Sequence, residues 1–164
     1  MLVFTSFEHM TRGERAMLYS YFMTALYGAA LCFVTVAGIA HLNGFLVPRS
    51  IFHIWVLVAG ALGACYGLKA CLSWLGHDGV RGWLGAAAGT LIIAFVAAII
   101  AGTLVLPLYG TMFGPFTLLI AIIERPFIAV LWVAGFARVH LWVLEWRHER
   151  DSIFRERPRE VSSA

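Results

Sequence analysis

Two long runs without a charged side chain dominate the pattern of this sequence. Residues 16–42 and 82–123 contain no Asp, Glu, Lys or Arg, and both runs are mostly apolar. A helix of about 20 apolar residues spans the ~30 Å hydrocarbon core of a bilayer. A soluble chain of 164 residues has no interior large enough to bury runs of this length. The pattern therefore predicts an integral membrane protein.

The apolar runs predict an all-α membrane domain in which four transmembrane helices form a bundle. We expect these helices at residues 16–42, 51–75, 83–106 and 127–146. Residues 108–123 are also apolar, but a fifth helix there would follow the third after a turn of one or two residues. Such a turn would leave backbone groups unpaired in lipid, at several kcal/mol each. We therefore predict that residues 108–123 form a short interfacial or re-entrant segment on the outer side.

Basic residues are concentrated in three of the segments that flank the predicted helices. They precede the first helix, flank the connection between the second and third, and follow the last: Arg12, Arg15, Lys69, Arg81 and residues 147–159. Lys and Arg accumulate on the cytoplasmic side of a membrane. We therefore expect an even number of crossings with both termini in the cytoplasm, a pattern that fits a bacterial inner membrane.

Composition agrees with this class of protein. Hydrophobic residues make up 61% of the chain and charged residues 13%, whereas soluble domains carry about 25% charged residues. The net charge of +3 is small, so nucleic acid is not an expected partner. We expect one membrane domain over residues 1–146 and a charged, helical cytoplasmic tail over residues 147–164.

The tripeptide Glu124-Arg125-Pro126 ends the second uncharged run and allows two interpretations. In the first, it lies at the outer surface and the last helix begins with Pro126, because the first turn of a helix tolerates proline. In the second, one long helix is kinked at Pro126 and carries Glu124 and Arg125 into the membrane. Charges at that depth are costly and are usually functional. The first arrangement costs less, and the pair is the main candidate for a polar pathway or partner contact.

Small residues recur at helical spacing on the second and third predicted helices. Gly60, Gly63 and Gly67 lie on the second, and Gly85 and Gly89 lie on the third. Glycines four residues apart allow close approach of two helix backbones in lipid. These faces either pack the helices within one chain or dock a second copy or another membrane subunit, and the sequence leaves both open.

Two histidines, His41 and His53, are expected near the outer ends of the first two helices. Paired imidazoles at one depth can ligate haem iron or another metal ion. No further Cys or carboxylate joins them, and polar residues at helix ends are also common at the membrane surface. We therefore treat them as weak cofactor candidates, and no cofactor is otherwise indicated.

A second polar group is expected near the inner side, formed by Lys69, Arg138, His140 and Glu145. Lys69 is close enough to its helix end to extend its ammonium to the headgroups. Arg138 lies four residues before Trp142 and is placed to stack on that ring. Alternatively, Arg138 and His140 line an inner vestibule or bind anionic lipid headgroups.

Three function classes remain open. The first is a non-enzymatic accessory or assembly subunit of a membrane complex, which packs against partners or copies of itself. The second is a small oligomeric transporter or channel that uses Glu124 and Arg125. The third is an electron carrier that binds haem or quinone through His41 and His53. No phosphate loop, nucleophile elbow or zinc-protease motif occurs in the sequence, so an enzyme is not indicated.

Overall fold

The computed structural model describes residues 10–39 and 51–154, and 92% of these residues are helical, without a strand among them. The helices are α1 (Arg12–Ile39), α2 (Ile51–Cys71), α3 (Gly79–Val105), α4 (Tyr109–Glu124) and α5 (Pro126–Phe154). A single 3-10 turn, Leu72–Trp74, follows α2. Helices α1, α2, α3 and α5 are each long and apolar enough to cross a membrane. The predicted all-α class is therefore confirmed, with four helices that could span a membrane.

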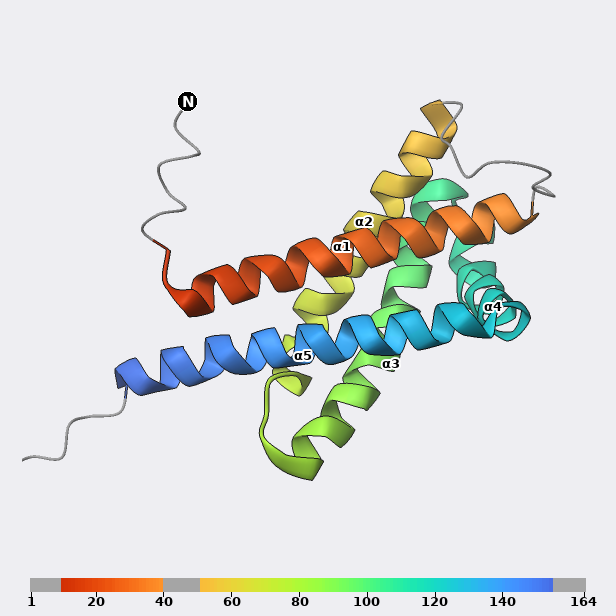
Figure 1. The fold of residues 1–164 in the computed structure, drawn as a ribbon. Helices are drawn as coiled ribbons and strands as arrows, with labels where there is room; N and C mark the ends of the chain where they lie inside the picture. Colours follow the sequence, from red (N-terminus) through yellow and green to blue (C-terminus); the bar gives the residue numbers. More distant parts are fainter. Residues whose placement is uncertain (1–9, 40–50, 155–164) are drawn as a thin grey trace, which may run out of the picture.

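The four long helices form two crossed pairs. Helices α1 and α5 run side by side in opposite directions, and α2 and α3 cross them steeply (Figure 1). Helix α2 packs against both α1 and α3, and α4 packs against α3 beside the beginning of α5. The largest buried cluster joins α2, α3 and α5, and consists of Leu68, Cys71, Leu75, Ala86, Ile93, Phe136, Val139 and Val143.

Glycines of α2 allow its close approach to two neighbours. A methyl group added at Gly63 would lie 2.7 Å from the carbonyl oxygen of Ala97 in α3, and one at Gly67 would lie 2.8 Å from that of Ile93. A methyl group at Gly60 would instead overlap the backbone of Gly28 in α1. The glycine-rich surface of α2 is therefore shared between α1 and α3 of the same chain.

Helices α3 and α4 form a tight antiparallel hairpin. Added methyl groups at Gly102 and Gly110 would each overlap the other residue's backbone, so the two helices touch at these glycines. The connection has only three residues, and Leu108 adopts a left-handed φ of 70°. Most of its backbone groups are paired, because Leu106 N–H donates to Gly102 at 2.8 Å and Gly110 N–H donates to Leu106 at 2.6 Å. A connection of three residues therefore joins the two helices with most of its backbone groups hydrogen-bonded.

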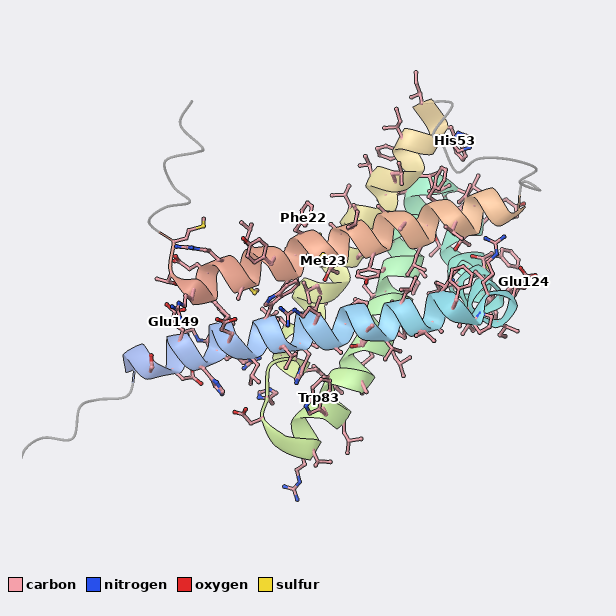
Figure 2. All side chains as sticks on the ribbon, viewed as in Figure 1. Phe22, Met23, His53, Trp83, Glu124 and Glu149 are labelled. Carbon is pink, nitrogen blue, oxygen red and sulfur yellow. The ribbon has the colours of Figure 1, made fainter. Side chains whose placement is uncertain are left out.

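The beginning of α1 is capped and attached to the end of α5. Thr11 Oγ1 accepts from Glu14 N–H at 3.2 Å, and Thr11 N–H donates to the Glu14 carboxylate at 3.0 Å. This reciprocal pair is a capping box, which satisfies backbone donors of a helix's first turn. Glu149 of α5 accepts a further hydrogen bond from Gly13 N–H. In Figure 2, Glu149 lies beside the first turn of α1, whereas Glu124 lies at the other end of the α1–α5 pair.

Helices α4 and α5 are separated by one residue. Arg125 has φ −134° and ψ 74°, which are not helical values, and α5 begins at Pro126. Proline at this position is compatible with a helix because the first N–H groups of a helix have no internal acceptor. The segment is thus two helices that diverge at Arg125, and not one long kinked helix.

Candidate functional site

A cavity of about 280 Å³ lies where the two helix pairs cross. It is bordered by all five helices, and small residues of α3 and α4 form much of its wall. Among the lining residues are Ala94, Ala97, Ala98, Ala101, Gly102, Gly110 and Gly114. Their short side chains leave space that larger residues would fill. The cavity therefore has the same origin as the close α3–α4 contact, namely a face of glycine and alanine.

The lining of this cavity is uncharged but includes several hydroxyl groups. Thr24 is only 1% exposed, and its Oγ1 has no hydrogen-bond partner within the described part of the chain. By contrast, Thr35 Oγ1 donates to Leu31 at 2.7 Å and Thr117 Oγ1 donates to Gly114 at 2.8 Å. A buried hydroxyl without a partner costs about 1–3 kcal/mol. Thr24 Oγ1 is itself enclosed by the protein, so this hydroxyl is an unpaired buried group in the wall of the cavity.

A second hollow of about 160 Å³ adjoins the first and carries the charges. It is lined by Glu124 and Arg125, together with Val34, Thr35, Thr117, Ile120 and Ala121. Thr35 and Thr117 line both spaces, so the charged hollow and the apolar cavity meet at these two residues. The site as a whole has one apolar end and one charged end.

Glu124 and Arg125 do not pair with each other. Neither residue takes part in an ion pair or side-chain hydrogen bond among residues 10–39 and 51–154. The Glu124 side chain is exposed and Arg125 is partly buried. The sequence therefore identified two residues of this site, and the structure adds the apolar cavity next to them.

The predicted inner polar group is not one cluster, because His140 has a structural environment of its own. His140 is 1% exposed, its Nδ1 accepts from Gly76 N–H at 3.1 Å, and its ring lies 4.7 Å from that of Trp83. Lys69 and Arg138 are exposed. The predicted stacking of Arg138 on Trp142 is confirmed, with 5.2 Å between the guanidinium carbon and the ring centre.

Residues of α5 hold the connection between α2 and α3. Besides the bond from Gly76 to His140, Arg147 donates to the Leu72 carbonyl at 2.9 Å. His148 Nε2 lies 2.7 Å from the Asp78 carboxylate, at an exposed position. The Arg147 side chain is thus directed to the end of α2. This set of contacts fixes a loop and does not form a cavity.

The candidate histidine pair is described only in part. The His53 ring lies 5.7 Å from the Phe33 ring and 6.1 Å from the Phe52 ring, near the beginning of α2 (Figure 2). His41 lies outside the described residues. Within the described ranges, no group of three or more His, Cys, Asp or Glu is placed to hold a metal ion.

The threonines of the site were not predicted from the sequence. Thr24 and Thr35 are eleven residues apart, which is about three turns of a helix, so both lie on one face of α1. Two hydroxyls on one face of an apolar helix are a usable signal, but many transmembrane threonines simply bond to their own backbone. That Thr24 forms no such bond becomes visible only in the structure.

Comparisons with protein families, with characterised proteins and with solved structures found no match for this chain.

Proposed function

We propose that this protein is a non-enzymatic integral membrane subunit that holds an amphipathic, lipid-like molecule between its two crossed helix pairs. The observation that carries the proposal is the cavity of about 280 Å³, which is apolar along its length and charged at one end. Sites for small molecules are concave, mostly apolar, and contain a few polar groups that fix orientation. This lining has that composition.

In a membrane, the polar part of such a molecule determines how selectively it is bound. Moving an apolar chain from the bilayer into an apolar cavity gains little, because lipid tails are as apolar as the cavity wall. Selectivity then comes from polar contacts, which are worth more where water is excluded. In this site the polar contacts available are Glu124 and Arg125 in the adjoining charged hollow.

The proposal is tested by filling the cavity. Ala94 of α3 lines the cavity, whereas Ala87 of the same helix is exposed outside it. We expect Ala94→Phe to displace the bound molecule and Ala87→Phe to retain it, as measured by native mass spectrometry of protein purified in mild detergent. Both variants are first compared by circular dichroism for equal helix content. A wild-type protein without any bound lipophile, or equal retention by both variants, would refute the proposal.

A transporter is the second candidate, and one observation favours it. The two hollows adjoin at Thr35 and Thr117. Together they reach from the charged pair at the end of α4 to Ile93 on α3. A homo-oligomer would be needed to complete a pathway. Purified protein in liposomes should then release an entrapped solute or ion, and neutralising both charges should stop the release.

The same proposal includes the location and orientation of the protein in the membrane. Both termini face the cytoplasm of a bacterial inner membrane, and α4 lies on the outer side as an interfacial or re-entrant helix. The attachment of the beginning of α1 to the end of α5 through Gly13 and Glu149 supports a common side for these two ends. Partners are lipid and either further copies of the chain or other membrane subunits.

A further inference from the structure

The charged hollow presents two opposite charges that leave each other unpaired. Glu124 ends α4, and Arg125 is the single residue between α4 and α5. Both line the same space of about 160 Å³, and neither has an ion-pair partner among the described residues. Glu124 is exposed and Arg125 is partly buried, so both charges are open to a charged group of a bound molecule. A molecule that carries both a cation and an anion would compensate both.

We propose that this hollow binds the zwitterionic headgroup of a phospholipid, with its phosphate at Arg125 and its ammonium group at Glu124. The inference rests on the proposed function, because it assigns the headgroup of the molecule whose tail occupies the adjoining cavity. A guanidinium matches phosphate oxygens through two parallel hydrogen bonds. The carboxylate of the preceding residue supplies the complementary charge for an ammonium group.

The pair of charges also determines which headgroups are disfavoured. An anionic headgroup such as phosphoglycerol would satisfy Arg125 and leave Glu124 facing a negative charge. A cationic amphiphile would satisfy Glu124 and leave Arg125 facing a positive charge. Like charges placed together reduce binding of the wrong partner. The site therefore selects against both classes.

The source of the headgroup is a lipid and not a free solute. Thr35 and Thr117 line both spaces, so the tail of a molecule whose headgroup lies in the charged hollow is next to the apolar cavity. Free phosphoethanolamine would leave the cavity empty and would not bind comparably.

The test uses Trp132 as a reporter, because this side chain lines the apolar cavity. Full-length protein in mild detergent is titrated with phosphatidylethanolamine or phosphatidylglycerol that carries brominated acyl chains, which quench a nearby indole. A Trp132→Phe variant, which retains the other five of the six tryptophans, defines the background. We expect phosphatidylethanolamine to bind about fivefold more tightly than phosphatidylglycerol, the factor that one partly exposed charge pair supplies.

Three variants separate the roles of the two charges. Glu124→Gln should abolish the preference for phosphatidylethanolamine, and Arg125→Gln should weaken binding of both phospholipids. Glu145→Gln removes an exposed carboxylate from α5, outside both hollows, and should leave the preference unchanged. Free phosphoethanolamine should not displace the brominated lipid.

The outcomes distinguish the two proposals. If neither lipid quenches the Trp132 signal, the cavity does not hold an acyl chain and the proposed function fails. If both lipids quench it equally in the wild type, the cavity holds a chain and only the headgroup assignment is overturned. Displacement by free phosphoethanolamine would also overturn it, in favour of a soluble ligand.

Discussion

Single polar residues in this protein pair with backbone groups at helix ends. Glu149 accepts from Gly13 at the beginning of α1, and Arg147 donates to the Leu72 carbonyl after α2. The first N–H groups and the last carbonyls of a helix have no internal partners, so side chains that pair with them stabilise the helix ends. Several polar residues near the α5 end therefore stabilise structure, and their presence alone does not indicate a pathway.

His140 gives a direct test at the residue scale. Replacing His140 by Ala removes the acceptor of the buried Gly76 N–H and leaves a void beside Trp83. We expect a loss of about 1–3 kcal/mol from the unpaired N–H alone. His140→Asn should recover part of this loss, because its side-chain oxygen can take the position of Nδ1. Thermal unfolding in detergent measures both effects.

The control for this prediction is His148→Ala. The His148 and Asp78 side chains are 59% and 70% exposed, so their pair is worth about 1 kcal/mol or less. Faster exchange of the Gly76 amide hydrogen in His140→Ala, and not in His148→Ala, would assign the loss to the missing bond. Equal stability of wild type and His140→Ala would contradict the assigned role.

At the scale of elements, the long helices were predictable and their crossing was not. Uncharged runs show where helices lie, because length and apolar composition decide whether a helix can span lipid. The charged ends were harder to place, since α1 already begins at Arg12 and α5 continues to Phe154. Capping by Thr11 and Glu14 explains the early start of α1. The single sequence offered no equivalent signal for the three-residue turn between α3 and α4.

The cavity depends on the crossing and was therefore not predictable. Which neighbour each glycine of α2 faces is fixed only when α1 and α3 are both placed, with Gly60 against α1 and Gly63 against α3. The same holds for Thr24, whose hydroxyl is unusual only because no neighbouring helix supplies a partner. Glu124 and Arg125 were identified because charge in an apolar run is visible without any tertiary information.

Two glycine-to-alanine changes test the helix contacts. A methyl group at Gly63 would lie 2.7 Å from the Ala97 carbonyl oxygen, so α2 and α3 would have to separate. We expect Gly63→Ala to destabilise the protein by about 1–3 kcal/mol, the usual cost of overpacking. At Gly85 the nearest atom would be the Trp74 carbonyl oxygen at 3.4 Å, an ordinary contact. Gly85→Ala should therefore be neutral or slightly stabilising through its higher helix propensity.

The stabilities of the two variants are compared with that of the wild type by thermal unfolding in the same detergent. Both glycines belong to pairs four residues apart, so the sequence pattern alone treats them alike. Equal loss in both variants would indicate that Gly85 contacts something absent from this chain, such as a second copy. A neutral Gly63→Ala would contradict the close packing of α2 on α3.

For the whole molecule, the main question is how many times the chain crosses the membrane. Helix α4 has 16 residues, and a helix of that length is about 24 Å long, shorter than the ~30 Å hydrocarbon core. It follows directly after the end of α3, and its own end lies beside Val34 and Thr35, near the end of α1. Both ends of α4 are thus close to helix ends that a four-crossing arrangement places on one side.

Fusion reporters at the two ends of the chain test this count. With four crossings, a reporter that is fluorescent only in the cytoplasm should be active at the N-terminus and at the C-terminus. The same reporter placed after residue 45, in the connection between α1 and α2, should be inactive. Since a fifth crossing by α4 would move the end of α5 to the other side, activity at only one end would contradict the four-helix arrangement. It would also place Glu124 and Arg125 on the side where α1 begins, away from the Thr35 that they adjoin in this fold.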